Sequence, residues 1–414
     1  MANIAKARSD LLQIFRAAVK RVEGRTLVRE YLEARETEGV FSLVAVGKAA
    51  GSMARGAVDA LGERLHGGLV VSKPGHLQTG ALAAAGLQGL EGGHPVPDAG
   101  SLAAGKRLLA FLDDLPPGQP LLFLISGGAS SLVEVLPPGM GLKQLQAVNR
   151  WLLGSGLPIT AMNRVRKGLS TIKGGRLLSR LGERRVLALM ISDVPGDDPA
   201  VIGSGLLVPD PSLRDGLAEL ALPGWLREQL DAVPEARESP RRQPEIHILG
   251  TLREAREAAA AAARDLGYQS HLNHAFLSAE AENCGRRLGL ELLDAWPGVH
   301  IWGGEPSVRL PANPGRGGRN QHLALALATV IEGRDDICFL SGGTDGTDGP
   351  GEDAGALVDG GTLGRARRAG FDAREALARA DAGSLLAATG DLVRTGPTGT
   401  NVMDLMLGLK LASG

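Results

Sequence analysis

The amino-acid sequence predicts an α/β fold, in which short buried strands alternate with helices in mostly parallel sheets. Apolar runs of four to six residues recur along the chain, and such runs are typical of strands buried on both faces. Several of the segments between them carry apolar residues at helical spacing. The composition fits a globular protein, because 43% of the residues are hydrophobic and 22% are charged.

The first predicted element is an amphipathic helix over residues 1–22, with Ile4, Leu11, Phe15 and Val19 on its apolar face. Charged residues interrupt this segment, so it does not have the pattern of a signal peptide. The strands predicted next cover residues 41–46, 68–71, 121–125 and 186–191, and a helix over 49–61 follows the first of them.

A polar segment over residues 234–243 separates two groups of elements. It holds two prolines and almost no apolar residues, which is typical of a linker. Beyond it, Thr251 and Glu254 form a capping box that begins a helix through Leu266. Further strands are predicted over 246–249, 299–302 and 337–340. We therefore expect one domain over residues 1–238 and a second over 245–414.

Charge and aromatic content argue against several classes of protein. The formal net charge is −1 and the chain has 7 Phe, 4 Trp and 2 Tyr, so neither a phosphate-neutralising surface nor a base-stacking platform for nucleic acid is expected. No apolar run approaches the roughly 18 residues that a membrane span needs. Cys284 and Cys338 fit no metal or redox spacing and are expected to be buried thiols. A soluble cytoplasmic protein is the expectation.

Glycine is abundant, with 59 residues, and it clusters where predicted strands end. The turns that follow these strands are Gly47-Lys48, Ser126–Gly128, Ser192-Asp193, Gly303–Glu305 and Ser341–Gly346, and all but Ser192-Asp193 contain glycine. Ligands of open α/β sheets bind outside the carboxyl ends of the strands, and glycine there can expose backbone amides to an anion. The alternative is that these turns simply use glycine for its freedom of conformation. The clustering favours a phosphate site.

Cationic side chains lie close to these glycines. Lys48 follows the first strand, and the loop 313–321 brings Arg319 to the start of a predicted helix. Lys173 belongs to a basic stretch over 163–180 that we predict as one helix opened by Asn163, although two glycines follow Lys173 inside it. Ammonium and guanidinium groups at such positions suit phosphate or carboxylate. Solvated turn and surface cations are the alternative.

Carboxylates also follow two of the strands. Asp193, Asp197 and Asp198 come after the strand over 186–191, and Asp345 and Asp348 come after the strand over 337–340. Magnesium is commonly bound by one or two carboxylates together with substrate phosphates, so these turns are candidate metal sites. The sequence contains no zinc spacing of His and Cys, no G-x-S-x-G elbow and no G-x-G-x-x-G after the first strand.

Nine segments together resemble a known family. They are VGKAAGSMA (46–54), GGHPVPD (92–98), LISGGASSL (124–132), NRVRKGLSTIKGGRL (163–177), ISDVPGDDPAVIGSG (191–205), GGEPSV (303–308), GRGGRNQ (315–321), SGGTDGTDGP (341–350) and TGPTGTNVMDL (395–405). With these motifs in this order, the chain resembles the glycerate 2-kinases of the MOFRL type, which are sometimes labelled hydroxypyruvate reductases. One departure is Gly168, where the family often has histidine.

The resemblance implies a Rossmann-like, doubly wound N-terminal domain and a smaller C-terminal α/β domain, with the active site in the cleft between them. The segment from about residue 395 would pack back on the first domain. The implied reaction transfers the γ-phosphoryl of ATP to the 2-hydroxyl of D-glycerate with Mg²⁺, giving 2-phosphoglycerate and ADP. Lys48 and Arg319 match the family's catalytic residues. They are expected to clamp the reactants from the two domains, which close on substrate.

The expected site has three parts. Lys48, Arg319 and Asp193 are the catalytic candidates, and Asp193, Asp197 and Asp345 are the candidates for magnesium. Whether Asp193 or Asp345 orients the hydroxyl is left open. The candidates for binding substrate or nucleotide are Gly47, Ser126, Gly127, Gly128, Ser130, Lys173, Gly304, Glu305, Asn320, Gly343, Thr344, Thr400 and Asn401.

Two other functions stay open at this point. The first is an NAD(P)H-dependent hydroxypyruvate reductase, which the missing G-x-G-x-x-G disfavours. The second is a noncatalytic anion-binding protein, which the retained Lys48, Arg319, Asp193 and Asp345 disfavour. No nucleic-acid or membrane partner is expected, D-glycerate is the expected small molecule, and a homodimer is one assembly that the sequence allows.

Overall fold

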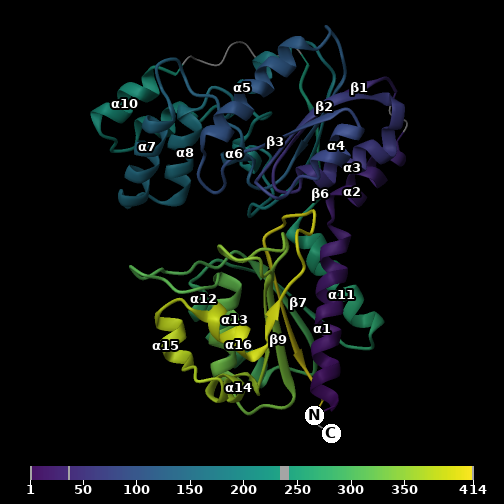
Figure 1. Ribbon diagram of the computed structural model, residues 1–414, viewed down its shortest axis with the longest axis vertical. Helices are drawn as coiled ribbons and strands as arrows, with labels where there is room; N and C mark the ends of the chain where they lie inside the picture. Colours follow the sequence, from purple (N-terminus) through teal and green to yellow (C-terminus); the bar gives the residue numbers. More distant parts are fainter. Residues whose placement is uncertain (1, 36–37, 234–241, 413–414) are drawn as a thin grey trace. The chain divides into compact units, whose positions relative to one another are not determined.

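The computed structural model describes residues 2–35, 38–233 and 242–412, and the chain divides into two compact units (Figure 1). We call Gly24–Leu249 the N-terminal unit, and Met1–Glu23 with Gly250–Gly414 the C-terminal unit. Most of the predicted linker, residues 234–243, lies outside the described residues. The prediction that residues 1–23 belong to the first domain is wrong, because α1 (Ala2–Arg21) packs in the C-terminal unit.

Helix α1 packs against α11 (Leu252–Asp265) and the sheet of the C-terminal unit, as Figure 1 shows. The apolar residues predicted for its buried face do lie there, with Leu11 and Phe15 fully buried. The close approach is possible partly because Gly342 has no side chain. A Cβ at that position would lie 2.9 Å from the Phe15 ring. The periodicity thus predicted the helix, but it could not tell which sheet the helix covers.

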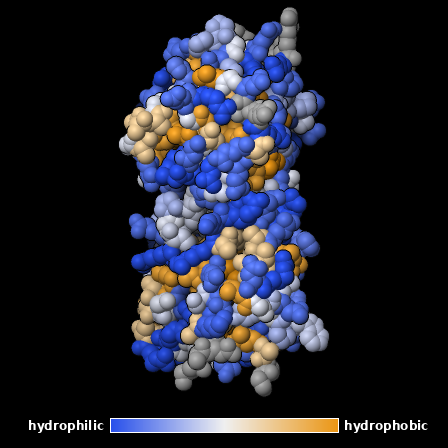
Figure 2. Space-filling view, turned by 90° about the vertical axis from the view of Figure 1, so that its right-hand side faces the viewer, coloured by the Kyte–Doolittle hydropathy of each residue, from blue (hydrophilic) through white to orange (hydrophobic). Residues whose placement is uncertain are grey.

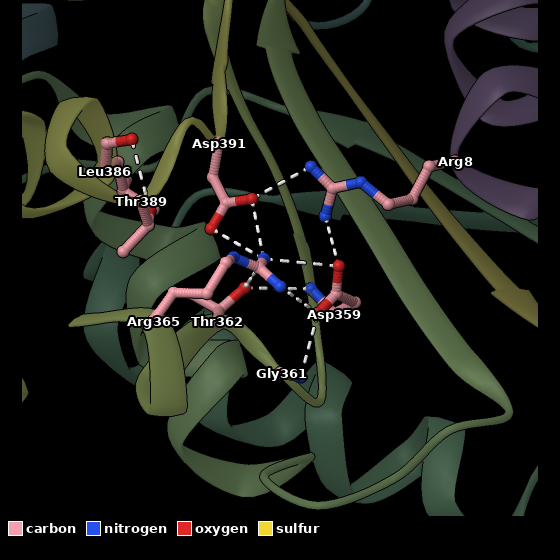
Figure 3. Close-up of polar contacts among 8 residues, drawn as sticks. All are labelled: Arg8, Asp359, Gly361, Thr362, Arg365, Leu386, Thr389 and Asp391. Carbon is pink, nitrogen blue, oxygen red and sulfur yellow. Dashed lines mark hydrogen bonds and ion pairs between the residues drawn. The ribbon is translucent and has the colours of Figure 1, made fainter. Parts of the chain in front are cut away.

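A network of charges also holds α1 to this unit (Figure 3). The Arg8 guanidinium donates to the carboxylates of Asp359 and, at 2.8 Å, Asp391. Arg365 bonds the same two carboxylates from the other side, at 3.0 Å and 2.8 Å. Burial alone would raise the pKa of Asp359, but hydrogen bonds from Arg365 and the charge of Arg8 outweigh burial and lower it. Arg8 therefore links α1 to two segments more than 350 residues away.

The N-terminal unit contains a sheet with strand order β3-β2-β1-β4-β5-β6. The pairs β1–β2, β2–β3, β1–β4 and β4–β5 are parallel, which confirms the Rossmann-like prediction. The bounds are β1 Phe41–Val46, β2 Leu65–Ser72, β3 Leu87–Glu91, β4 Leu121–Ile125, β5 Val186–Ile191 and β6 Glu245–Gly250. Because β1, β4 and β5 are adjacent and parallel, their carboxyl ends meet at one edge of the sheet.

Helices surround this sheet. Ala104, Leu108 and Leu112 of α5 pack in one core with β1 and β4, and α3 packs on β1 and β2. The bounds are α2 Gly24–Glu33, α3 Ala50–Leu61, α4 Thr79–Ala84, α5 Ala99–Asp114, α6 Ala129–Leu132, α7 Leu142–Gly154, α8 Ile159–Leu169, α9 Leu213–Ala218 and α10 Gly224–Asp231. Helices α7, α8 and α10 contribute to a separate apolar cluster.

The basic stretch over 163–180 is not one helix. Helix α8 begins before it, at Ile159, and ends at Leu169. Gly174 and Gly175 follow with φ of +62° and +81°, values outside the helical range, and a 3₁₀ turn then covers Arg176–Arg180. A Cβ on Gly175 would lie 2.5 Å from Pro209 Cα, so the chain passes another segment closely here. The helix therefore ends before the glycine pair, and the pair separates it from the 3₁₀ turn.

The sheet of the C-terminal unit is mixed, with strand order β11-β10-β9-β12-β8-β7. Only the β7–β8 pairing of the described residues is parallel, so the prediction of mostly parallel strands is wrong for this unit. The bounds are β7 Ser270–Leu277, β8 Gly298–Gly304, β9 Ile337–Gly343, β10 Gly355–Asp359, β11 Leu392–Val393 and β12 Asp404–Lys410. Residues 404–410 form an inner strand of this sheet, which corrects the expectation that the segment from 395 packs on the first domain.

Helices cover both faces of the second sheet. On one face α1 and α11 share an apolar cluster with the strands, and on the other α12, α13 and α16 form a second cluster. The remaining bounds are α12 Ala281–Asp294, α13 Arg319–Val330, α14 Thr362–Arg368, α15 Ala373–Ala378 and α16 Ala382–Thr389. The carboxyl ends of β8 and β9 lie at the edge where antiparallel β12 begins, since Asp404 pairs with both Gly304 and Gly343.

Hydrophilic residues cover most of the face shown in Figure 2, and apolar residues occur between them in smaller groups. No helix in the described ranges is both long enough and apolar enough to cross a bilayer. Both cysteines are buried thiols, as predicted.

Candidate active site

Lys48 lies in the turn that follows β1, with a half-buried side chain. Gly47 precedes it with φ of +135°. The Gly47 N–H donates to the Val71 carbonyl at 3.1 Å, and the Lys48 N–H donates to the Gly127 carbonyl at 2.8 Å. These bonds tie the turn to β2 on one side and to the turn after β4 on the other. The position of Lys48 is therefore set by the sheet itself.

Ser126 occupies the space beside Gly47. A Cβ on Gly47 would lie 2.1 Å from Ser126 Oγ, so the position requires glycine. The buried hydroxyl accepts a hydrogen bond from the Ala49 N–H at 3.0 Å. The amides of Gly47, Lys48 and Ala49 thus all donate to acceptors within the N-terminal unit, on β2 and in the turn after β4. The expectation that Gly47 offers its amide to an anion is wrong, and its role is to let β1 and β4 end close together.

Gly127 and Gly128 complete the turn after β4. Gly128 has φ of +82° and begins α6. A Cβ on Gly128 would lie 3.0 Å from His94 Cδ2 and 3.2 Å from Lys48 Cγ, so an imidazole and the lysine stem both border this glycine. The GGHPVPD motif contributed to the family resemblance, but no site residue was predicted in it. The position of His94 directly after a glycine pair could have marked it as a candidate, because the other candidate cations also lie beside glycines.

Two predicted binding residues are engaged within the N-terminal unit. The Ser130 hydroxyl forms a hydrogen bond with the Ser204 hydroxyl. Lys173 is 2% exposed, and its ammonium pairs with the equally buried carboxylate of Glu134. A charge in such surroundings is costly without its partner, so removal of either side chain is expected to destabilise the interior. The structure places Lys173 in a structural pair instead of leaving it to face a ligand.

Asp193 and Asp197 lie in the segment after β5, the strand next to β4 in the sheet. Asp197 has φ of +54°, in the left-handed region, and its N–H donates to the Val194 carbonyl at 3.2 Å. Asp198 is used locally, since its carboxylate accepts from the Ala200 N–H at 2.8 Å. Lys48, Ser126 and Asp193 thus follow three neighbouring parallel strands.

Arg319 is the first residue of α13 in the C-terminal unit. The helix has a glycine, Gly318, at its N-cap, and the carboxylate of Asp348 supplies the cap. It accepts from the N–H groups of Asn320 at 3.0 Å and Gln321 at 2.8 Å. A Cβ on Gly318 would lie 2.4 Å from Asp348 Oδ1, so glycine is needed for this contact. Burial raises the pKa of Asp348 to about 6, against the opposing effect of the two amides.

Asp404, the first residue of β12, holds the side chain of Arg319. Its fully buried carboxylate accepts from Arg319 Nε at 2.5 Å and from Nη2 at 2.9 Å. Glu305, after β8, lies 3.4 Å from Nη1 and is half exposed. Burial would lower the pKa of Arg319, but the charge of Asp404 and its hydrogen bonds raise it well above the usual value. The guanidinium is charged and oriented, and its Nη1 side lies toward Glu305.

Asn320 is fully buried. Its side-chain oxygen accepts from the Ser341 hydroxyl at 2.6 Å, and its amide nitrogen donates to Asp348 at 3.3 Å. The structure therefore places Asn320 in the support of α13 and β9. Asn320 was predicted to bind substrate or nucleotide, but the hydrogen bonds of its side chain are made to Ser341 and Asp348 within the C-terminal unit.

The turn after β9 carries three predicted residues. The Gly343 N–H donates to the Ala354 carbonyl at 2.8 Å, so this amide is used in the fold and does not await an anion. Thr344 is buried and bonds the segment before β12 through the Met403 carbonyl. Asp345 is 7% exposed, and its Oδ1 accepts from the N–H and the hydroxyl of Thr347, each at 2.9 Å.

The predicted residues Gly304, Thr400 and Asn401 lie at the same edge of this sheet. A Cβ on Gly304 would lie 2.1 Å from the Leu277 carbonyl oxygen, so this glycine allows β7 and β8 to end close together. Thr400 and Asn401 precede β12 and are buried. The Thr400 hydroxyl has no hydrogen-bond partner among the described residues, which makes it a candidate for bonding a ligand.

Within residues 2–35, 38–233 and 242–412, no three His, Cys, Asp or Glu side chains lie together as a metal site would require. The carboxylates predicted for magnesium fall into separate turns, with Asp193 and Asp197 in the N-terminal unit and Asp345 in the C-terminal unit. Magnesium in phosphotransferases takes one or two protein carboxylates and completes its shell with phosphate and water. Each of these turns offers one or two carboxylates, which is the number that such a site takes from the protein.

Residues 10–232 match the domain of unknown function DUF4147, and residues 298–404 match the MOFRL family. A D-glycerate 2-kinase of Thermotoga maritima is 37% identical over 96% of this chain and 97% of its own length. The chain belongs to the MOFRL glycerate kinase family. The crystal structure of a Thermotoga maritima glycerate kinase covers 98% of the chain and 100% of its own, with a TM-score of 0.86 and 34% identity.

Relatives in this family carry two kinds of name. A glycerate 2-kinase of Pyrococcus horikoshii is 31% identical over 90% of this chain and 88% of its own length. A protein of Agrobacterium vitis that is 41% identical, over 97% of this chain and 94% of its own, is named as a hydroxypyruvate reductase. The family is thus settled by sequence and fold together, whereas the two names describe different reactions.

Proposed function

We propose that this member of the MOFRL glycerate kinase family is a glycerate 2-kinase that uses ATP and Mg²⁺. The observation that carries the proposal is that each unit supplies one cation in such a position, a lysine at a parallel-strand end in the N-terminal unit and an arginine at a helix start in the C-terminal unit. Lys48 and Arg319 hold these positions in a chain similar to glycerate 2-kinases over nearly its whole length. Phosphoryl transfer depends mainly on positioning and charge stabilisation, which these groups supply.

In the reaction the oxygen of the glycerate 2-hydroxyl forms a bond to the γ-phosphorus of ATP. The bond from that phosphorus to the bridging oxygen breaks, ADP leaves, and the hydroxyl proton passes to a base. Lys48 donates hydrogen bonds to an oxyanion of the reactants. Arg319 presents its Nη1 side, which Asp404 orients, to a second oxyanion in place of Glu305. Bound magnesium would neutralise phosphate charge and draw electrons from the phosphorus.

Asp193 and Asp345 share the two remaining roles, metal binding and acceptance of the hydroxyl proton. Asp193→Asn and Asp345→Asn separate them. The variant that lost a metal ligand needs more Mg²⁺ for half-maximal rate, whereas the variant that lost the base has a lower kcat at every Mg²⁺ concentration. Asp197→Asn is measured in the same way, because Asp197 is the third carboxylate predicted to bind magnesium and lies four residues after Asp193.

The deciding experiment measures ADP release from Mg-ATP and D-glycerate, with the product passed to enolase in the absence of a mutase. Only 2-phosphoglycerate is then consumed, so the assay also establishes which hydroxyl is phosphorylated. No ADP release with D-glycerate would contradict the proposal. Oxidation of NAD(P)H by hydroxypyruvate, followed at 340 nm, tests the other name found among relatives. The engagement of the first-strand turn's amides within the fold argues against a dinucleotide there.

A further inference from the structure

His94 is held in one place by the loop that carries it. The Gly92 N–H donates to the Ser72 carbonyl at 3.0 Å, and a Cβ on Gly92 would lie 2.4 Å from the Leu132 carbonyl oxygen. The next amide, that of Gly93, donates to Asp98 Oδ1 at 2.9 Å. The two residues before His94 therefore have little freedom to move.

The same loop is joined to the start of α5. Asp98 is the N-cap of this helix and accepts from the Ser101 N–H at 2.9 Å, while the Ser101 hydroxyl accepts from the Gly93 N–H at 3.0 Å. Hydrogen bonding by these amides lowers the pKa of Asp98, although burial opposes the shift. The capping box thus anchors the loop on both sides of His94 to a sixteen-residue helix.

The imidazole of His94 lies against the turn after β4, which the proposed catalytic lysine also borders. It lies against Gly128, since a Cβ there would be 3.0 Å from Cδ2 and 3.2 Å from Nε2. The same Cβ would lie 3.2 Å from Lys48 Cγ, so His94 and Lys48 border one glycine from two sides. A side chain at residue 128 would push into both. These contacts give a second reason, in addition to its φ of +82°, why residue 128 is glycine.

We propose that His94 is a ligand-binding residue that contacts the same oxyanion as Lys48. An imidazole N–H and an ammonium are both hydrogen-bond donors, and the side chains that carry them border the same glycine at the carboxyl edge of a parallel sheet, where ligands of such folds bind. The oxyanion belongs either to the phosphates of ATP or to the carboxylate of D-glycerate. The identity of these ligands rests on the proposed function, but the contact between His94 and the oxyanion is independent of it.

The test compares His94→Asn with wild type and with His66→Asn, a control on the exposed amino-terminal end of β2. Calorimetric titrations use ATP, D-glycerate and inorganic phosphate as separate probes. Loss of one charge-assisted hydrogen bond weakens binding by about 10- to 100-fold. We expect such a rise in Kd, and in the matching KM, for ATP if the oxyanion is a phosphate or for D-glycerate if it is a carboxylate. His66→Asn should match wild type for every probe.

Unchanged binding of all three probes to folded His94→Asn would overturn the proposal. Circular dichroism checks folding, and His94→Gln serves as a second variant. If neither variant folds, NMR of the wild-type protein tests the contact through the ring resonances of His94. They should shift when ATP or D-glycerate saturates the protein, and no shift with either ligand overturns the contact. If the wild type releases no ADP with D-glycerate, the proposed kinase function is wrong. The titration with inorganic phosphate still tests whether His94 contacts an oxyanion.

Discussion

The guanidinium of Arg319 and the carboxylate of Asp404 form a two-pronged ion pair, with contacts of 2.5 Å and 2.9 Å. Asp404 is fully buried, whereas the side chain of Arg319 is 35% exposed. One end of the pair is therefore fixed in the sheet and the other reaches its surface. Such geometry sets the plane of the guanidinium and leaves the Nη1 side for an exchangeable partner. In the proposed reaction, Asp404 therefore acts on the ligand only through Arg319.

Replacing Asp404 with asparagine should lower kcat by about 10- to 100-fold. The amide keeps the shape of the side chain but removes the charge and one acceptor, so the guanidinium is no longer held in one plane. Arg319→Lys is the matched variant, because lysine keeps the charge but cannot form the two-pronged contact. We expect the double variant to be no slower than the slower single variant, as measured by ADP release.

A purely structural role for Asp404 would give a different pattern. The thermal midpoint would then fall with kcat, and the effects of the two substitutions on activity would multiply. Full activity in folded Asp404→Asn would refute the positioning role.

Asp348 makes the stability of the C-terminal unit depend on pH. Its pKa is raised from 3.8 to about 6 in the folded protein, mainly by burial. The folded state therefore binds the proton more tightly than the unfolded state. The stabilisation is complete below pH 3.8 and is lost as the pH rises through about 6. Between pH 7 and pH 5 the free energy of unfolding should rise by about 1 kcal/mol from this group.

Urea unfolding of wild type and Asp348→Asn at several pH values measures this contribution. Asp348 uses both carboxylate oxygens to accept the N–H groups of Asn320 and Gln321, whereas asparagine has only one acceptor oxygen, so the variant should be less stable throughout. The difference between the two proteins should grow as the pH falls from 7 to 5. A constant difference, or one that shrinks toward pH 5, would contradict the raised pKa.

The sequence predicted those parts of the fold that depend on local pattern. Strands β4 and β5 are continuous apolar runs, β1 is apolar except for Ser42, and the prediction of all three was confirmed. Strand β12 was missed, since it begins and ends with a charged residue and Gly408 interrupts its apolar run. Gly408 lacks a side chain because a Cβ there would lie 2.7 Å from Leu292, and this contact depends on a helix more than 100 residues earlier. No local pattern carries that information.

The same distinction applies to the site. Lys48 and Arg319 became candidates because each sits in a glycine-rich turn beside a strand or helix. Asp404 was missed because it follows Arg319 by 85 positions, and only the pairing of β12 with β8 and β9 brings the two together. Glycine was correctly linked to close backbone approaches. The amides of Gly47 and Gly343, however, bond within the fold, which sequence alone could not reveal.

Removal of Arg8 should loosen α1 from the C-terminal unit. In Arg8→Met the carboxylates of Asp359 and Asp391 keep Arg365 but lose one of their two cationic partners. Breaking buried ion pairs in this way typically costs about 3–5 kcal/mol, and the partial exposure of Arg8 places the expected loss at the lower end. Arg16→Met, at an exposed position of the same helix, should change the free energy of unfolding by no more than about 0.5 kcal/mol.

Hydrogen exchange locates the effect. Amides of α1 should exchange faster in Arg8→Met, while those of β1 and β4 in the N-terminal unit should be unchanged. Equal stability of the Arg8 and Arg16 variants would show that the apolar face of α1 alone holds the helix.

Gly47→Ala should be far more harmful than alanine at another glycine with positive φ. Gly62 has φ of +52° and ψ of −125° with open space around it, so alanine there meets only backbone strain, about 1–3 kcal/mol. At Gly47 the new methyl group would lie 2.1 Å from Ser126 Oγ and 2.5 Å from the Ser126 carbonyl oxygen. The ends of β1 and β4 must then separate, which moves Lys48. We expect Gly47→Ala to lose several times as much stability as Gly62→Ala and to have a much lower kcat.

Adding Ser126→Ala to Gly47→Ala should not restore activity, because the clash with the backbone oxygen persists. Recovery in that double variant would show that the hydroxyl alone, and not the approach of the two strands, makes glycine necessary at position 47.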